Sequence, residues 1–362
     1  MRRSAPLVSV EDLHVSFLTE QGSVRAVDGV SFDLEPGKSI GIVGESGSGK
    51  SVTAKTLMNL LPSYAQVEGS MKFDGRDLRE IARKKEKHFW GVEMTMIFQD
   101  PMTSLNPVKR IGEQIAESLR VHMNRSRSEA MTEAGELLEQ VGIPEPAKRL
   151  RQYPHELSGG LRQRVVIAIA LACGPRLLIA DEPTTALDVT VQKHILDLLD
   201  DLRKERGMSM ILITHDLGVV KGRTDEIMVM YGGRTMEEAP TSTLFESDGL
   251  HPYTEALNAT IPKIDTPSHT RLVPIPGKPP EIIGKIIGCP FVQRCRYSTS
   301  ECLTEMPSLV EQEEGHFCAC HNPVGTPEGV NAREANQNAG YTPAGLDMKE
   351  FETFVRADTG GL

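Results

Sequence analysis

The sequence predicts an α/β fold with a helical insertion and a small cysteine-containing C-terminal extension. Between residues 7 and 240, short runs with strand propensity alternate with helical stretches, which is the pattern of an α/β domain. The runs Thr95–Phe98, Leu177–Ala180 and Met210–Thr214 are apolar at nearly every position, as expected of strands that are covered on both faces. A further run, Ser39–Val43, leads into a glycine-rich turn and then a helical pattern.

The remaining elements follow from periodicity and composition. Two more runs, Val8–Phe17 and Ser70–Phe73, are expected to be strands. Apolar residues recur at helical spacing between Ile111 and Leu150, so we expect a helical subdomain at about residues 100–165. Prolines punctuate the chain after Pro240, which predicts a second region at residues 241–325. Residues 326–362 are rich in Gly, Pro, Asn and Ala, and we expect a largely disordered tail.

Charge and hydropathy exclude some functions. The 362-residue chain has a formal net charge of −10, which argues against nonspecific nucleic-acid binding because no basic field attracts phosphate groups. The longest apolar run, Val165–Cys173, has nine residues, whereas a helix needs roughly 20 to cross a bilayer. The start of the chain turns acidic before any long apolar stretch, so no secretory signal is predicted. We expect a cytoplasmic protein whose membrane role depends on partners.

The glycine-rich turn has the composition of a phosphate-binding loop. Successive backbone N–H groups and the start of the following helix would surround phosphates, Lys50 would reach the β- and γ-phosphates, and the Ser51 hydroxyl would bind Mg²⁺. The alternative is a glycine-rich turn without a ligand, and the order strand, loop, helix favours the nucleotide site. The predicted nucleotide-binding residues here are Gly44, Glu45, Ser46, Gly47, Ser48, Gly49, Lys50, Ser51 and Val52.

Two acidic residues end a later apolar strand. In the segment Leu177–Glu182, Asp181 is expected near the metal and Glu182 near the attacking water. The alternative is a strand followed by a solvated acidic turn. Its position downstream of a phosphate loop favours the catalytic interpretation.

A third motif lies between these two. Ser158, Gly159 and Gly160 open a predicted helix, so their N–H groups and the hydroxyl can face a phosphate. In isolation, the alternative is an N-capped helix with a flexible start. Together with Gln99, Asp188 and His215, the order of motifs from Val8 to Glu238 resembles the ABC ATPase family. The resemblance implies a P-loop NTPase fold with a RecA-like core, an antiparallel β subdomain and a helical subdomain.

The resemblance also implies roles for individual residues. Two nucleotide-binding domains would close head to tail around two ATP molecules, with Ser158, Gly159 and Gly160 contacting the γ-phosphate held by the partner's loop. Asp188 would bridge the dimer interface. Phe17 matches the aromatic residue that stacks on adenine, although a core phenylalanine is the alternative.

The catalytic set follows from the same resemblance. Glu182 would act as general base or orient the water, His215 would hold the γ-phosphate and the water, and Gln99 would sense Mg²⁺ and the water. The predicted catalytic residues are Glu182, His215, Gln99 and Lys50, and the predicted Mg²⁺ ligands are Ser51, Gln99 and Asp181.

Further segments resemble the ATPase subunits of oligopeptide and dipeptide importers. They are Phe98–Pro107, His251–Thr254, Pro274–Gly277, Cys289–Phe291 and Arg294-Cys295. The resemblance implies an ATP-hydrolysing subunit at the cytoplasmic face of the cell membrane. Its partners would be a second ATPase subunit in a heterodimer, two permease subunits and an extracellular solute-binding protein. Alternatives are import of nickel or another small solute, a non-transport ABC ATPase, and an iron–sulfur sensor.

Five of the six cysteines lie between Cys289 and Cys320. Thiolates are soft ligands suited to zinc or iron–sulfur clusters, and short C-x₂-C pairs typical of zinc ribbons are absent from the sequence. The importer resemblance implies a four-iron cluster, with Cys318 as a possible substitute for the fourth ligand. Reduced, unligated thiols are the alternative. The predicted ligands are Cys289, Cys295, Cys302 and Cys320.

Overall fold

The computed structural model describes residues 5–350, apart from positions 21, 87, 101–103, 186, 248–249, 262–274, 281 and 285. Residues 101–103 of the importer-like segment, Pro274, and the predicted tail from residue 351 onward therefore lie outside the described residues. No helix in the described ranges is long and apolar enough to cross a membrane.

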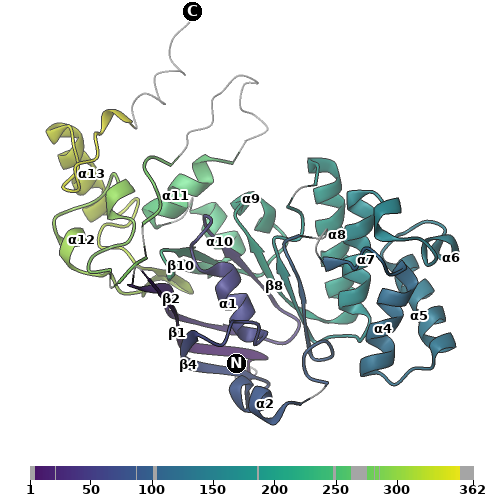
Figure 1. Ribbon diagram of the computed structural model, residues 1–362. Helices are drawn as coiled ribbons and strands as arrows, with labels where there is room; N and C mark the ends of the chain where they lie inside the picture. The colour runs from purple at the N-terminus through teal and green to yellow at the C-terminus, as the bar shows by residue number, and fades with distance from the viewer. Residues whose placement is uncertain are drawn as a thin grey trace, which may run out of the picture.

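Two sheets organise the chain (Figure 1). The first is antiparallel, with the order β2-β1-β4-β5. Val8 of β1 pairs with Leu34 of β2 on one side and with Phe73 of β4 on the other. This sheet is the predicted antiparallel subdomain, and its strands are β1 (Val8–Thr19), β2 (Gly22–Leu34), β4 (Ala65–Phe73) and β5 (Arg76–Asp77).

The second sheet has eight strands in the order β11-β12-β10-β9-β3-β8-β7-β6. The five strands from β9 to β6 run parallel, whereas β10, β12 and β11 join the sheet antiparallel. The bounds are β3 (Ser39–Val43), β6 (Met94–Ile97), β7 (Leu177–Asp181), β8 (Ser209–Thr214), β9 (Glu226–Tyr231), β10 (Arg234–Pro240), β11 (Val310–Glu313) and β12 (His316–Cys318). The predicted α/β core is confirmed, because β3, β6, β7 and β8 are buried at every position.

One group of helices, at residues 111–171, lies on the right of Figure 1, and another, after residue 250, lies on its left. The first group is the predicted helical subdomain, in which buried residues such as Ile115, Leu138 and Ile167 form one apolar cluster. It contains α4 (Ile111–His122), α5 (Arg127–Gln140), α6 (Pro146–Arg149) and α7 (Gly159–Leu171). The other described helices are α1 (Lys50–Leu57), α2 (Leu78–Lys84), α8 (Val189–Arg206), α9 (Leu217–Val220), α10 (Thr241–Glu246), α11 (Pro252–Ala259), α12 (Glu301–Thr304) and α13 (Pro327–Ala339).

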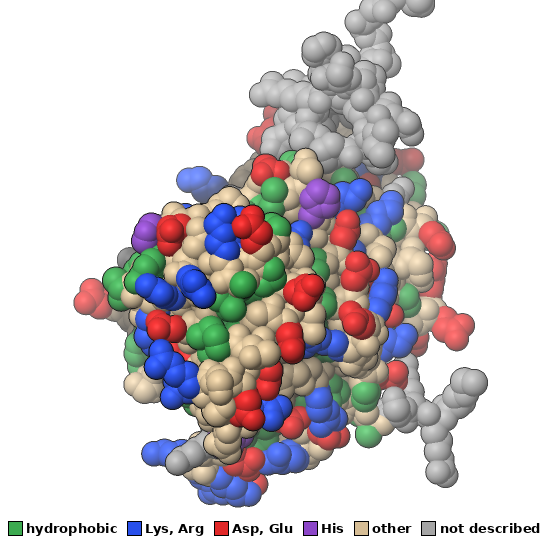
Figure 2. Space-filling model, turned by 90° about the vertical axis from the view of Figure 1, so that its right-hand side faces the viewer, with side chains coloured by type: hydrophobic (Ala, Val, Ile, Leu, Met, Phe, Trp, Pro, Cys, Tyr) green, Lys and Arg blue, Asp and Glu red, His purple; other side chains and the backbone are tan. Residues whose placement is uncertain are grey.

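Lys and Arg side chains lie among Asp and Glu side chains on the face of the helical subdomain (Figure 2). Apolar side chains are interspersed between them. A surface of mixed sign does not create the continuous positive potential that attracts a nucleic-acid backbone.

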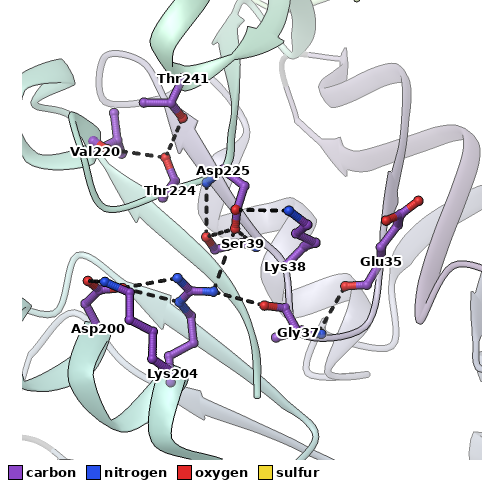
Figure 3. A network of polar contacts seen from close by, with 12 residues as sticks. Glu35, Gly37, Lys38, Ser39, Asp200, Lys204, Val220, Thr224, Asp225 and Thr241 are labelled. Carbon is purple, nitrogen blue, oxygen red and sulfur yellow. Dashed lines mark hydrogen bonds and ion pairs between the residues drawn. The ribbon is translucent and has the colours of Figure 1, made fainter. Parts of the chain in front are cut away.

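A polar network fixes the start of β3 (Figure 3). A carboxylate oxygen of Asp225 accepts hydrogen bonds from the Ser39 backbone N–H at 2.8 Å and from the Ser39 hydroxyl at 2.7 Å. Arg203 of α8 donates to the Gly37 carbonyl at 3.0 Å and forms an ion pair with Asp200 at 3.2 Å. The network joins β3, α8 and the start of β9, so the strand that precedes the phosphate loop is held at its first residue.

The C-terminal region continues the main core. Strand β12 pairs with β10 through Glu237–Cys318 and Glu238–Phe317, and thereby extends the eight-stranded sheet. Phe291 and Cys295 belong to the same apolar cluster as Leu212 of β8. The prolines after residue 240 mark a change from regular to irregular backbone, and the apolar core continues across this point.

The helix α13 replaces part of the expected disordered tail. Thr326 caps its start, Gly340 ends it in the left-handed conformation, and the buried Asn336 side chain donates hydrogen bonds to the carbonyls of Arg296 and Ser298. Capping and amide hydrogen bonds therefore stabilise a segment whose composition has few large apolar residues. The prediction of disorder failed here because it considered composition alone.

Candidate functional site

The loop between β3 and α1 needs its glycines. Gly44, Gly47 and Gly49 have φ values of 159°, 82° and 101°. A Cβ atom at Gly44 would lie 2.2 Å from the Met230 carbonyl oxygen, and one at Gly49 would lie 2.4 Å from the Ala26 carbonyl oxygen. Side chains are excluded at these two positions, so the backbone can turn tightly from the strand into the helix.

Lys50 is buried at the first residue of α1, with 4% of its surface exposed. Its ammonium group donates to the carbonyl oxygens of Gly44 at 2.6 Å and Glu45 at 2.8 Å, and to the Ser48 hydroxyl at 3.3 Å. Burial lowers the pKa of Lys50, although the nearby carboxylates of Glu182 and Asp181 oppose this effect. The ammonium group of Lys50 therefore lies inside the loop, and a bound anion would replace the Gly44 and Glu45 carbonyl oxygens as its partner.

The neighbouring loop positions differ in exposure. Ser46 and Gly47 are exposed, whereas Ser48 is buried and Val52 packs partly against the apolar core. The exposed turn is the part of the loop that a ligand can approach.

Ser51 and Asp181 meet at the carboxyl ends of β3 and β7. The Ser51 hydroxyl donates to a carboxylate oxygen of Asp181 at 2.9 Å. Burial raises the pKa of Asp181, while the bond from Ser51 opposes the shift and the negative charge of Glu182 adds to it. A hydroxyl and a carboxylate this close supply the oxygen ligands that Mg²⁺ prefers, so these residues fit the predicted metal site.

Glu182 is the centre of a small polar cluster. Its backbone φ of 47° is uncommon for a residue other than glycine, and its N–H donates to the Ile213 carbonyl at 2.9 Å. Burial raises the pKa of Glu182, but hydrogen bonds from Thr185 and His215 outweigh it, so the net pKa is lowered. The carboxylate is therefore ionised at neutral pH.

Predicted partners surround this carboxylate. Gln99 follows β6 and donates to Glu182 Oε2 at 2.8 Å, and His215 Nδ1 lies 3.3 Å from Glu182 Oε1. Thr185 donates to Oε2 at 2.9 Å. The structure thus brings together Gln99, Glu182 and His215, which are far apart in the sequence.

Phe17 lies partly buried on β1, against the apolar core. The Tyr64 ring stands edge-on to it, with ring centroids 6.2 Å apart, and 64% of the Tyr64 surface is exposed. The two rings form an accessible aromatic edge beside the antiparallel sheet. A flat heterocycle can pack against such an edge.

The predicted motif Ser158–Gly160 lies at the exposed start of α7. Ser158 caps this helix by accepting a hydrogen bond from the Leu161 N–H at 3.4 Å, and Ser158 and Gly159 are exposed. A Cβ atom at Gly160 would lie 2.8 Å from Val191 of α8. Asp188 is also exposed, and it caps α8 by accepting from the Val191 N–H at 2.9 Å. Both helix starts therefore face solvent.

The four predicted cluster ligands line one narrow cavity. Cys289, Cys295, Cys302 and Cys320 all border it, and His251 and Asn322 are among their neighbours. Cys318 instead lies in β12, fully buried. Burial raises the pKa of Cys289 to about 12 and that of Cys295 well above its usual value.

Backbone donors already point at two of these sulfurs. The Thr299 N–H lies 3.5 Å from Cys302 Sγ, and the Asn322 N–H lies 3.4 Å from Cys320 Sγ. Within the described part of the chain, no three His, Cys, Asp or Glu side chains converge closely enough to hold a single metal ion. In the described residues these four cysteines therefore form no assembled metal site.

Several residues of the site were not found from the sequence. Thr185 and Tyr64 contact predicted site residues, and Tyr253 and Arg294 contact the phosphate loop. The Thr185 position, three residues after Glu182, is a local signal that sequence reasoning could have used. The other contacts join segments that are distant in the chain.

Comparison with known protein families agrees with the motifs. Residues 27–185 match the ABC transporter family, and residues 236–302 match the C-terminal region of oligopeptide/dipeptide transporters. The oligopeptide transport ATP-binding protein OppD of Escherichia coli is 48% identical over 88% of this chain and 94% of its own length. The dipeptide transport ATP-binding protein DppD of Bacillus subtilis is 45% identical over 87% of this chain and 94% of its own length.

Another relative is longer. OppD of Mycobacterium tuberculosis is 49% identical over 87% of this chain, and the chain spans 52% of that protein. Among solved structures, the ATP-binding cassette MJ0796, a dimer in a post-hydrolysis state bound to ADP and Pi, has a TM-score of 0.58. It is 26% identical and the match covers 65% of this chain and 98% of the cassette. The chain therefore belongs to the ATP-binding proteins of ABC transporters, in the family of the oligopeptide and dipeptide transport subunits.

Proposed function

We propose that this chain hydrolyses ATP to drive an ABC importer of peptides. The observation that carries the proposal is the convergence of Lys50, Ser51, Asp181 and Glu182 beside the ends of β3 and β7, with His215 just after β8. Phosphoryl transfer to water needs a phosphate cradle, metal ligands and a group that orients the water. All three kinds of group are present in this one region.

In this proposal the loop holds the triphosphate. Lys50 exchanges its bonds to the Gly44 and Glu45 carbonyls for the β- and γ-phosphate oxygens, and Phe17 with Tyr64 packs against the adenine. Ser51 and Asp181, together with Gln99, hold Mg²⁺. The bound ion would neutralise charge that develops on the transferred phosphate.

Glu182 orients the attacking water and accepts its proton, and its lowered pKa keeps it ionised for that role. His215 holds the γ-phosphate and the water from the opposite side. Gln99, already bonded to Glu182, reports the presence of Mg²⁺ and water. Positioning and electrostatics supply the catalysis.

A second ATPase chain completes the site. Ser158, Gly159 and Gly160 stand at an exposed helix start, where their N–H groups can bind the γ-phosphate held by a partner's loop. Asp188, exposed at the start of α8, contacts the partner across the same interface. The dimeric state of the similar cassette MJ0796 supports this arrangement. We propose a different ATPase subunit as this partner, which makes the pair a heterodimer.

The relatives support a peptide cargo. OppD and DppD are named for oligopeptide and dipeptide transport, and this favours peptides over nickel and over a non-transport role. The chain would work at the cytoplasmic face of the membrane, bound to two permease subunits. An extracellular solute-binding protein would present the peptide to those permeases.

We also propose that the cysteine cavity binds a four-iron cluster through Cys289, Cys295, Cys302 and Cys320. Support comes from the shared cavity and from N–H donors directed at two of the sulfurs, because hydrogen bonds to sulfur are typical of such sites. ATP hydrolysis itself requires no redox chemistry. The cluster would therefore have a structural or regulatory part.

Uptake measurements test the function. Cells whose only copy is Lys50→Ala should lose ATP-dependent uptake of labelled oligopeptides and dipeptides, because the triphosphate loses its main cation. Lys84→Ala, an exposed lysine of α2, is the matched control and should retain uptake. Normal peptide uptake by Lys50→Ala, or loss of nickel uptake alone, would contradict the proposal.

A further inference from the structure

Glu45, an acidic residue inside the phosphate loop, forms an ion pair with a buried arginine of the C-terminal region. Arg294 belongs to the short 3-10 turn Val292–Arg294 and is only 4% exposed. Its two terminal nitrogens lie 2.5 Å and 3.0 Å from the two carboxylate oxygens of Glu45. This is the bidentate geometry that makes an arginine–carboxylate pair strong and directional.

The arginine is itself fixed in place. Its Nε donates to the Pro276 carbonyl at 2.6 Å, one Nη donates to the Ile275 carbonyl at 3.2 Å, and the other donates to the Tyr231 hydroxyl at 3.1 Å. Each N–H group of the planar guanidinium thus donates to Tyr231 of β9, to a carbonyl of residues 275–276, or to Glu45. A lysine has one ammonium group and cannot reproduce this arrangement.

The backbone of Glu45 has a second anchor. Its N–H donates to the Tyr253 hydroxyl of α11 at 2.8 Å. Phe291, which borders the cysteine cavity, packs against both Tyr231 and Tyr253 with ring centroids 5.2 Å apart in each case. The first turn of the phosphate loop is therefore held by residues of the C-terminal region, 208 and 249 residues further along the chain.

A carboxylate in a phosphate loop has an electrostatic cost. A triphosphate carries several negative charges, and an unpaired carboxylate in the same loop would repel it in a partly buried, weakly screened site. Glu45 is only 26% exposed, so water screens its charge incompletely. Pairing with Arg294 neutralises that charge and also fixes the loop before the nucleotide arrives, which reduces the ordering cost of binding.

We infer that Arg294, in the C-terminal region, is a positioning residue of the ATP site. Through its ion pair with Glu45, it neutralises the charge of the phosphate loop and orders its backbone. The inference rests on the proposed ATP-hydrolysing function and extends it. The C-terminal region is then a part of the nucleotide site, in addition to any role in transport. Because Arg294 does not reach the reacting atoms, it affects ATP affinity and leaves the chemical step intact.

The test compares variants of the purified transporter complex. Arg294→Gln should raise the Kd for Mg-ATP and the KM about tenfold, within the usual range of coupling between neighbouring sites, with kcat at saturating ATP within about twofold of wild type. Arg296→Gln is the control, since Arg296 lies two residues away and pairs with Glu255 at 2.6 Å. It should leave the Kd unchanged.

A second substitution separates charge from packing. In Arg294→Gln/Glu45→Gln the loop has no unpaired carboxylate, so the part of the ATP affinity lost to charge repulsion should return, whereas the part lost with the ordering ion pair should not. If Arg294→Gln does not fold, Arg294→Lys provides the same comparison, with an intermediate Kd expected. Unchanged affinity in the Arg294 variant, or a double variant that binds no better than the single one, overturns the inference. A wild-type complex that does not bind Mg-ATP would instead refute the proposed function.

Discussion

The Ser51 hydroxyl lies 2.9 Å from a carboxylate oxygen of Asp181, although 130 residues separate the two. The sheet explains the meeting, because β3 and β7 both pair in parallel with β8 and their carboxyl ends share one edge. Ligand sites of open α/β sheets lie at this edge. The arrangement predicts a metal site shared by the phosphate loop and the acidic strand.

Removing the hydroxyl should weaken this metal site. Ser51→Ala is expected to shift the Mg²⁺ concentration for half-maximal ATPase activity upward by about tenfold, since one of few oxygen ligands is lost. Ser51→Thr keeps a hydroxyl and should behave like wild type. A Mg²⁺ titration of ATPase activity in the purified complex provides the measurement, and identical midpoints for Ser51→Ala and wild type would count against the site.

The aromatic edge should contribute to ATP affinity. Phe17→Ala and Tyr64→Ala are each expected to raise the KM for ATP about three- to tenfold, because a ring contact contributes about 0.5–1.5 kcal/mol. Leu18→Ala is the control, since Leu18 is 62% exposed on the same strand. If Phe17→Ala alters thermal stability but leaves the KM unchanged, Phe17 is a core residue and the adenine assignment fails.

The cysteine cavity distinguishes Cys320 from Cys318. After anaerobic purification, Cys320→Ser should lose most of the bound iron and the charge-transfer absorbance of the protein, because a cavity-lining thiolate is lost. Cys318→Ser removes a buried thiol outside that lining and should retain both signals. Stoichiometric zinc without iron in the wild-type protein, or equal iron in the Cys320 variant and wild type, would refute the cluster.

Glu238 should make stability depend on pH. Burial, together with Glu226 and Asp33, raises the pKa of Glu238 from 4.5 to about 7. A raised carboxyl pKa means that the folded state binds the proton more tightly, so the contribution to stability is full below pH 4.5 and is lost as the pH rises through about 7.

Glu238→Gln replaces the carboxyl by an uncharged amide, so the variant should not lose stability as the pH rises through about 7. At pH 8.5 the free energy of unfolding of the variant should exceed that of wild type by about 2 kcal/mol. This is less than the free energy that corresponds to the whole pKa shift, because Glu238 is partly exposed. At pH 4 the two proteins should be nearly equal. Thermal unfolding at both pH values measures the difference, and Glu246→Gln on α10 serves as the control. A variant with the same stability as wild type at pH 8.5 would contradict the assignment.

The motifs predicted the core of the site because each chemical group follows a strand with a recognisable apolar pattern. Ser39–Val43 is a strand with the predicted bounds, and Leu177–Ala180 and Met210–Thr214 are each extended by one residue in the structure. The parallel sheet then brings together residues that its motifs place at strand ends. This is why the sequence alone predicts Lys50 and Asp181 in one site.

Other features depend on contacts that no local pattern records. The three residues of β12, His316–Cys318, are too few to show a strand period, and they pair with β10 because the C-terminal segment folds back. The apolar run of β9 is visible in the sequence, although it is not among the strands expected above. The ion pair between Glu45 and Arg294 depends on that fold-back, so no spacing in the sequence predicts it.

Glu182 is proposed to direct hydrolysis of an ATP molecule shared by two chains. The most direct measurement is ATP turnover and nucleotide retention by the assembled transporter carrying Glu182→Gln. We expect turnover to fall by at least about 100-fold, by analogy with the loss of a general base, while the complex retains Mg-ATP and its two ATPase subunits stay closed. Turnover at the wild-type rate, or a complex that neither retains Mg-ATP nor closes around it, would contradict the claim.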